Sequence, residues 1–358
     1  MRTLLIAPSF GEFGGIESFM FRLARTLHDE DDSASTTICF KRVTTFQMQE
    51  TLTRALASVP ARVVFVDRAS HALVRTIRCA DIVHSQNPSI DIAFATACLR
   101  KPHVMTIHAG RHQRWTARGV ADLVAANLAD RRLYNSDFVW DSWEPRGRHP
   151  TSAKLPILSN LPTGPVDPGE RRGFVFVGRW VPNKGLEVLI DAYARAELDP
   201  HTWPLTMMGE GPLRPALEGL IKQRGIRGIE VTGYVDDDVR NRRIRMSKWL
   251  VAPPHTNEDL GLTPIEARNV GVPCIVTRDG GLLEAAGAFS LSCEPGDVEQ
   301  LSRLLQFAAA LDERSYERLA QETHRELKSY LQPMASYLRL YREMLSVSRT
   351  AQTVDMET

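Results

Sequence analysis

Short apolar runs alternate with amphipathic stretches along the first half of the chain. The apolar runs predict strands at residues 3–7, 37–40, 62–66, 82–84 and 104–108. Helices are predicted between them at residues 16–28, 46–56 and 70–78. The first of these helices places Phe19, Leu23 and Leu27 on one face. This alternation is typical of a parallel sheet with helices on both faces.

A second series of the same kind follows a break in the pattern. Residues 159–169 are rich in proline and glycine, which is typical of a linker or hinge. Beyond them, strands are predicted at residues 173–177, 205–208, 229–232, 249–252 and 274–277, and helices at 185–196, 212–224 and 263–270. The prediction is an α/β fold of two tandem, doubly wound, Rossmann-like domains, residues 1–162 and 163–332, facing a central cleft. Ligands of such sheets bind beyond the carboxyl ends of the strands, so chemistry is expected in the loops that follow them.

The end of the chain is predicted to be helical, at residues 298–310, 315–330 and 334–347. Pro333 is expected to break or kink the last stretch. We expect the helix at about 333–347 to pack back on the N-terminal domain.

Composition then narrows the classes of function. The 358 residues have a net charge of +1, with 20 Lys+Arg against 15 Asp+Glu in residues 1–165 and 24 against 28 in the rest. The excess of basic residues in the N-terminal half is what an anionic acceptor or an anionic membrane face would favour. Chance variation in charge along the chain explains an excess of this size equally well. Nucleic-acid binding would need a denser basic patch.

The five widely spaced cysteines include no Cys-x-x-Cys pair, which favours a reducing cytosol over a disulfide framework or a zinc site. No stretch approaches the ~18 apolar residues of a membrane-spanning helix.

The segment from Val251 to Pro273 carries the strongest chemical signal. A predicted strand runs into a loop with Glu258 and Gly261, and a helix follows. Thr263 is the expected N-cap of that helix, and Pro264 suits its first position. The free amides and the positive end of the helix dipole make a phosphate site there. Gly261 has no side chain, so a diphosphate can approach the backbone closely. The two carboxylates, Glu258 and Glu266, suit a ligand with hydroxyls on both sides of its diphosphate.

These carboxylates also have structural interpretations. Thr263-x-x-Glu266 matches a capping box, in which Glu266 would only hold the helix start. Glu258 would then be a solvated loop acid.

A second segment, Val177 to Gly185, places two cations where a predicted strand ends and a helix begins. Arg179 offers a bidentate fork and Lys184 a point charge, and together they suit a diphosphate. The spacing differs from that of a Walker A loop. The alternative is two surface cations on a turn.

These segments together resemble the family 4 glycosyltransferases of the two-domain B-type fold. Glu258 and Glu266, separated by seven residues, match the hallmark of that family. The resemblance implies that Glu258 contacts the donor sugar and that Glu266 contacts the ribose hydroxyls. It also implies that the amides of Gly261, Leu262 and Thr263 contact the diphosphate, and that Arg179 and Lys184 clamp it.

Further matches extend over most of the chain. Gly14 and Gly15 resemble the N-terminal glycine loop of the family, and His108 resembles the histidine that faces the donor sugar. The loops at residues 209–212 and 280–284 match two more recurring loops. The chain departs from the family pattern at Leu260, where phenylalanine is usual, and at Ala109, where an aspartate is common.

Two Asp-x-Asp clusters raise the question of a metal beside the diphosphate. Residues 29–32 follow a predicted helix end and are interpreted as a solvated turn. Residues 236–238 precede a predicted helix at 239–248 and are interpreted as an N-cap cluster. We therefore expect neither a metal nor a resident cofactor.

The sequence thus predicts a cytoplasmic enzyme that moves a sugar from a UDP- or GDP-linked donor to a glycan, lipid-linked or small-molecule acceptor. The resemblance implies retention at the sugar carbon and a role in cell-surface polysaccharide or glycoconjugate biosynthesis. Peripheral membrane contact through the N-terminal domain is part of this hypothesis. Residues 111–115, basic and aromatic, are either an acceptor contact or a solvated loop. The alternatives are a non-catalytic nucleotide-sugar-binding subunit and a nucleotide-sugar epimerase of the same architecture.

Overall fold

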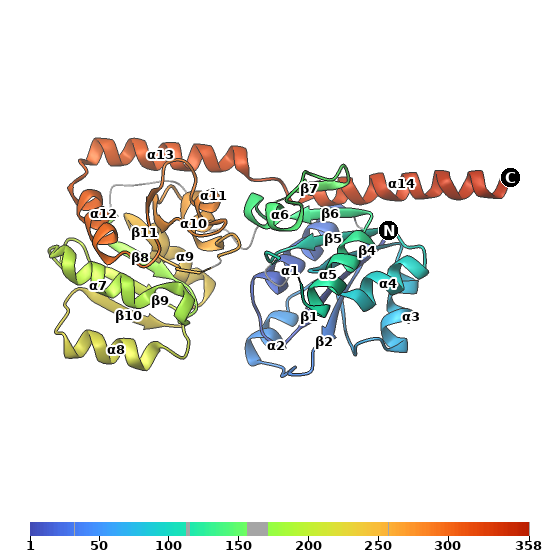
Figure 1. The fold of residues 1–358 in the computed structure, drawn as a ribbon, viewed down its shortest axis with the longest axis horizontal. Helices are drawn as coiled ribbons and strands as arrows, with labels where there is room; N and C mark the ends of the chain where they lie inside the picture. Colours follow the sequence, from blue (N-terminus) through green and yellow to red (C-terminus); the bar gives the residue numbers. More distant parts are fainter. Residues whose placement is uncertain (32, 112–114, 156–170, 257, 358) are drawn as a thin grey trace. The chain divides into compact units, whose positions relative to one another are not determined.

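The computed structural model describes residues 1–31, 33–111, 115–155, 171–256 and 258–357, with side chains up to residue 347. The chain divides into two compact units (Figure 1): unit 1 is Met1–Ser159 with Gln332–Thr358, and unit 2 is Asn160–Leu331. The predicted linker at 159–169 lies outside the described residues.

Unit 1 is built on one parallel sheet. Its seven described strands have the order β3-β2-β1-β4-β5-β6-β7. The strands are β1 (Arg2–Ser9), β2 (Ser35–Arg42), β3 (Arg62–Val66), β4 (Ile82–Gln86), β5 (His103–Ile107), β6 (Arg131–Tyr134) and β7 (Ser152–Lys154). The helices are α1 (Gly15–Glu30), α2 (Glu50–Leu56), α3 (His71–Cys79), α4 (Ile90–Cys98), α5 (Ala117–Asn127), α6 (Asp137–Trp143) and α14 (Ala335–Glu357). The strand order reverses at β1, as in doubly wound folds.

The two faces of this sheet carry different helices. On one face, α1 and α2 pack against the sheet together with α14, whose Tyr337, Leu338 and Tyr341 are buried in the same cluster as Phe19. On the other face, α3 to α6 pack through residues such as Leu73 and Ala125. The last helix of the chain therefore completes the core of the unit that contains the first strand. The chain does break around Pro333, since α13 ends at Tyr330 and α14 begins at Ala335.

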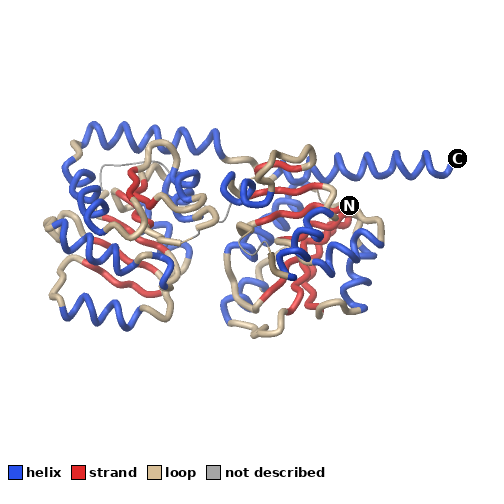
Figure 2. Tube along the Cα trace, in the orientation of Figure 1, coloured by secondary structure: helices blue, strands red, loops and turns tan. Residues whose placement is uncertain are grey.

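Unit 2 repeats the plan with a six-stranded parallel sheet in the residues described, of order β10-β9-β8-β11-β12-β13. The strands are β8 (Phe174–Val177), β9 (Leu205–Met208), β10 (Ile229–Gly233), β11 (Trp249–Ala252), β12 (Cys274–Thr277) and β13 (Leu291–Cys293). The helices are the 3₁₀ turn η1 (Pro182–Lys184), α7 (Leu186–Ala196), α8 (Arg214–Gln223), α9 (Asp237–Arg245), α10 (Leu262–Asn269), α11 (Leu282–Ala286), α12 (Val298–Ala310) and α13 (Glu313–Tyr330). Figure 2 shows helices around the strands of each sheet.

The fold class predicted from the sequence is confirmed. Strands β3, β9, β11 and β12 and helix α12 have the predicted bounds. The sequence analysis missed β6, β7, β13 and helices α4, α5, α6 and α11. Helix α2 begins at Glu50, four residues later than the predicted start at residue 46.

Candidate active site

At the carboxyl edge of the unit 2 sheet, the loop after β8 lies against the loop after β11. Gly185 has φ +66°, and a Cβ atom there would lie 1.8 Å from the carbonyl oxygen of Pro253. The His255 amide donates a hydrogen bond of 3.1 Å to the carbonyl oxygen of Asn183. Glycine at position 185 therefore allows the backbone beside Lys184 to approach the strand end that precedes Glu258.

This approach brings Lys184 and Glu258 into contact, although they lie 74 positions apart in the sequence. Lys184 Nζ donates a hydrogen bond to Glu258 Oε2, and the side chains are 21% and 17% exposed. The loop that bears Glu258 is fixed by its backbone: the Glu258 amide donates to Asp279 Oδ2 at 2.8 Å, and the Gly281 amide donates to the Glu258 carbonyl at 2.8 Å. Gly280 permits this packing, because its Cβ would lie 2.0 Å from the same carbonyl oxygen. The paired charges are thus held at the edge where ligands of parallel sheets bind.

The start of α10 differs from the prediction. Gly261, with φ +85°, is the N-cap, so Thr263 is the second helical residue and Pro264 the third. The prediction of Thr263 as N-cap was wrong, because the left-handed conformation open to glycine starts the helix two residues earlier. The helix begins with the amides of Leu262 and Thr263, which precede any i−4 partner in the helix. Both residues are half-buried, so an anion site at this end remains compatible with the fold.

Because the N-cap is Gly261, Glu266 lies too far along the helix to complete a capping box, and that interpretation was also wrong. The Glu266 side chain is 4% exposed, and its Oε1 lies 3.7 Å from Nη2 of Arg240 on α9. Arg240 also pairs with Asp237 at 3.1 Å. A buried carboxylate beside a partly exposed arginine is a polar site rather than a helix cap. The sequence analysis missed Arg240, which lies among several arginines of α9 with no distinguishing signal.

Arg179, the other predicted clamp residue, is exposed on the loop between β8 and η1. It makes no ion pair with any residue that the structure describes, whereas its neighbour Trp180 is fully buried. The structure therefore brings Lys184, Glu258 and the start of α10 to one edge of unit 2, and leaves Arg179 accessible to solvent on a loop of the same edge.

The carboxyl edge of the unit 1 sheet holds the remaining predicted residues. Gly14 and Gly15 are exposed at the start of α1, where the Gly14 amide donates to Glu17 Oε2 at 3.1 Å. His108 follows β5 directly and is 8% exposed. Its amide donates to Asn87 Oδ1 at 2.8 Å, which fixes the backbone at the strand end.

The His108 ring is neutral at physiological pH. Burial lowers the pKa of His108 from 6.5 to about 3. Its Nε2 lies 2.8 Å from Gln86 Oε1, which can only accept, so Nε2 carries the proton. Nδ1 is buried and makes no hydrogen bond to a residue that the structure describes. The ring can therefore accept a hydrogen bond at Nδ1 and is unsuited to donate a proton as an acid.

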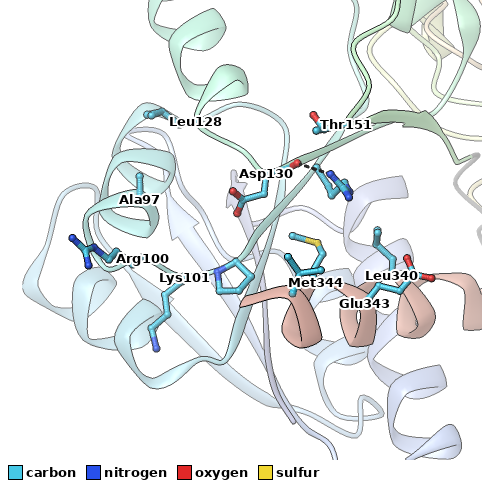
Figure 3. Close-up of a pocket in the computed structure, with 12 residues that line it drawn as sticks. Ala97, Arg100, Lys101, Leu128, Asp130, Thr151, Leu340, Glu343 and Met344 are labelled. Atoms are coloured by element: carbon cyan, nitrogen blue, oxygen red, sulfur yellow. Dashed lines mark hydrogen bonds between the residues drawn. The ribbon is translucent and has the colours of Figure 1, made fainter. Parts of the chain in front are cut away.

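Among the cavities lined by described residues of unit 1, two lie at opposite edges of its sheet. One of about 310 Å³ lies at the carboxyl edge and is lined by Asn87, Arg111, Arg118 and Trp143, among others. The second, of about 790 Å³, lies at the amino ends of β5 and β6 beside α14 (Figure 3). It is lined by residues such as Lys101, Asp130, Thr151, Leu340 and Met344. Because ligands of parallel sheets bind at the carboxyl ends, the smaller cavity is the better candidate for a substrate. Of residues 111–115, only Arg111 and Trp115 are described.

Comparison with known proteins assigns the family. The profile of "Glycosyltransferase Family 4" matches residues 13–152, and that of "Glycosyl transferases group 1" matches residues 164–326. The chain belongs to glycosyltransferase family 4. As a family 4 glycosyltransferase, it is similar to Anabaena HepE, solved in complex with UDP and glucose, with a TM-score of 0.76 at 16% identity over 97% of this chain and 100% of HepE. The two α/β units thus have the B-type fold.

Curated relatives match shorter parts of the family 4 chain. A glycogen synthase of Mycobacterium tuberculosis is 28% identical over 251 residues, which is 62% of this chain. A 2-deoxystreptamine glucosyltransferase of Streptomyces kanamyceticus is 27% identical over 208 residues, or 54% of this chain. The chain matches only 58% and 52%, respectively, of the length of these relatives.

Within the described residues, no group of three or more His, Cys, Asp or Glu side chains could hold a metal ion. The Asp236 side chain caps α9 by accepting from the Val239 amide at 2.8 Å, as predicted for this cluster. Asp31 Oδ1 accepts a hydrogen bond of 2.6 Å from the Ser33 hydroxyl in an exposed turn. None of the helices described is both long and apolar enough to cross a membrane.

Proposed function

We propose that this protein transfers a sugar from a nucleotide diphosphate sugar to an acceptor, and that unit 2 binds the donor. The observation that carries the proposal is the contact between Lys184 and Glu258 beside the start of α10. A cation, a carboxylate and free helix amides then lie at one sheet edge. Cations and amides bind a diphosphate, and a carboxylate accepts hydrogen bonds from sugar hydroxyls.

Each residue has a defined part in this proposal. Lys184 and Arg179 neutralise the diphosphate leaving group, together with the amides of residues 261–263. Because Lys184 and Arg179 are cationic, no metal or other cofactor is needed for this step. Glu266, held near Arg240, accepts hydrogen bonds from the ribose hydroxyls. Glu258 orients the transferred sugar.

The neutral His108 ring helps to position the donor sugar, as the family resemblance implies, and the exposed Gly14 and Gly15 leave the backbone of their loop open to a ligand. We propose retention at the sugar carbon, as is implied by the family resemblance.

The acceptor is assigned to unit 1. The 310 Å³ cavity with Arg111 and Arg118 has the cations to hold an anionic glycan, lipid-linked or small-molecule acceptor. The five free cysteines fit a cytoplasmic location, and the acceptor chemistry fits cell-surface polysaccharide or glycoconjugate biosynthesis at the inner face of a membrane.

A panel of nucleotide sugars tests this function directly. Binding to the native protein raises the melting temperature, so UDP- and GDP-linked sugars are screened first by thermal melting. UDP-glucose is the natural starting point, because HepE was solved with UDP and glucose. Stabilising donors are then incubated with the protein and candidate acceptors, and released nucleotide is measured. Stabilisation without any nucleotide release would leave a binding protein and refute transfer; no stabilisation by any donor would refute the donor site.

A further inference from the structure

Apart from Arg118, which lines the proposed acceptor cavity, the outward surface of α3, α4 and α5 in unit 1 is not used by the proposed reaction. These three helices cover one face of the sheet and bury Leu73, Ile92 and Ala125 against it. Helix α4 contacts both α3 and α5, so the three form one layer. Their opposite sides are exposed, and we call that surface the outer α3–α5 face.

Large apolar side chains are exposed on this face. Phe94 of α4 is 63% exposed, and Val120 and Val124, one turn apart on α5, are 52% and 46% exposed. Trp115, directly before the N-cap of α5, is 96% exposed. Three apolar residues exposed on two helices in contact, with a fourth directly before one of them, are more than scattered surface residues and mark an interaction site.

The same face is cationic. Arg75 and Arg78 of α3 and Arg118 of α5 are all exposed. The only acids in the three helices are Asp91 and Asp122.

Both acids are already paired. Asp91 is bonded to Lys41 at 2.7 Å, and Asp122 lies 3.9 Å from Arg118. Residues 68–129 contain eight Lys+Arg and three Asp+Glu, a difference of +5, which equals the whole basic excess of residues 1–165 (20 against 15). The basic bias of the N-terminal half is therefore concentrated in the stretch of chain that includes this face.

We propose that the outer α3–α5 face docks on an anionic lipid bilayer. Arginines attract the anionic headgroups, and Trp115, Phe94 and the two valines enter the boundary between headgroups and acyl chains, where aromatic side chains are favoured. A protein partner would need acidic groups matched to individual arginines, whereas a bilayer needs only this mixture of positive charge and apolar side chains. The docking rests on the proposed function at the inner face of a membrane, names the surface of the protein that meets it, and is measurable without any donor or acceptor.

Co-sedimentation of the full chain with vesicles is the test. The protein is mixed with phosphatidylcholine vesicles that contain or lack phosphatidylglycerol, at low and high salt. We expect binding to the anionic vesicles only, weakened by salt. Arg75→Gln with Arg78→Gln removes two charges, which should weaken binding about thirtyfold. Phe94→Ser with Trp115→Ser should weaken it by about tenfold or more.

Unit 2 supplies matched control variants. Arg303 and Arg325 are each 71% exposed, so Arg303→Gln with Arg325→Gln removes the same charge elsewhere. Phe307, 55% exposed, is the control for Phe94. Both controls should bind vesicles like the unchanged protein.

Several outcomes would overturn the proposal. They are absence of binding to anionic vesicles, equal binding to neutral ones, or equal losses in the controls. A dimer in sedimentation velocity that Phe94→Ser dissociates would show that the face joins two copies of the chain instead. Melting curves establish that each variant is folded, and UDP titration in parallel keeps the donor site separate from the docking result.

Discussion

Replacing Lys184 should lower the affinity for UDP, whereas replacing Glu258 should leave that affinity equal or raise it. In the ligand-free protein Lys184 is bonded to Glu258, and both side chains are about four-fifths buried (21% and 17% exposed). In the proposed complex the same ammonium faces a diphosphate. Glu258 therefore competes with the ligand for Lys184, and its own charge repels the phosphates.

The magnitudes follow from this arrangement. Lys184→Ala removes a charge-assisted contact, which is worth about 1.5–3 kcal/mol, so UDP affinity should fall by between roughly tenfold and 150-fold. Glu258→Gln removes a partner whose net pairing energy at partial exposure is about 1 kcal/mol. UDP affinity should then stay equal or rise by up to about fivefold, while sugar transfer falls because the donor sugar loses its carboxylate.

Calorimetric titration with UDP and GDP measures both variants. Lys248→Ala is the matched control, because Lys248 is 17% exposed and pairs with Glu313 at 2.6 Å just before β11, at the amino edge of the same sheet. It should bind UDP like the unchanged protein, and melting curves verify the fold. Unchanged affinity in Lys184→Ala removes Lys184 from the donor site. A loss in Glu258→Gln as large as that in Lys184→Ala would show that the pair is structural.

Four further outcomes are expected. Glu266→Gln should lose about 1–3 kcal/mol of nucleotide affinity in calorimetry with little change in melting temperature, and wild-type affinity would mean that its charge is not needed. Activity should survive EDTA, with Asp237→Asn nearly silent in the same turnover assay; complete loss that manganese restores would contradict this. Gly280→Ala should weaken UDP binding far more than Gly296→Ala, because a Cβ at 280 would lie 2.0 Å from a loop carbonyl while the one at 296 meets nothing within 4 Å; equal losses would count against the packed loop. Because the pKa of His108 is about 3 in the folded protein and 6.5 when unfolded, the unfolded state takes up the proton first as pH falls. The free energy of unfolding should thus fall below pH 6.5, and His108 should account for about 2 kcal/mol of the fall at pH 5. Urea unfolding at several pH values should show a correspondingly weaker pH dependence for His108→Asn. The same pH dependence in both proteins would refute this reasoning.

The sequence predicts most of the fold because strands buried on both faces are short, continuous apolar runs. β11 and β12 were predicted to the residue for this reason. β6 begins with Arg131 and Arg132, so it lacks the continuous apolar run of a buried strand, and α4 is too apolar throughout to show a helical period. Strands and helices of that kind are identified only when the structure shows which other elements lie beside them.

The sequence predicts which residues belong to the candidate site, but not which side chains they contact. The carboxylates and cations carry a recognisable spacing, so Glu258, Glu266 and Lys184 could be named. Their partners depend on the fold: Lys184 meets Glu258 across 74 positions, and Glu266 lies near Arg240 of another helix. The N-cap was misassigned to Thr263, because the preference for a hydroxyl at that position is a local rule. The positive φ of Gly261, where an added Cβ would lie 2.6 Å from Leu282 Cδ1, is a feature of the folded structure.

The burial of Tyr337 and Tyr341 in the core of unit 1 has a consequence for synthesis of the chain. The ring nitrogens of His84 on β4 lie 2.6 Å from the Tyr341 hydroxyl and 2.7 Å from the Thr106 hydroxyl. Of these two partners, Tyr341 lies more than 250 residues after His84 in the sequence. At ~5–20 residues per second, the ribosome needs roughly 10–40 s to pass from residue 155 to residue 334. During that interval the nascent first unit lacks part of its apolar core, while the second unit is completed and can fold. Of the two units, unit 1 is therefore begun first and completed last, and an apolar surface on it must be kept from aggregation until α14 has been synthesised.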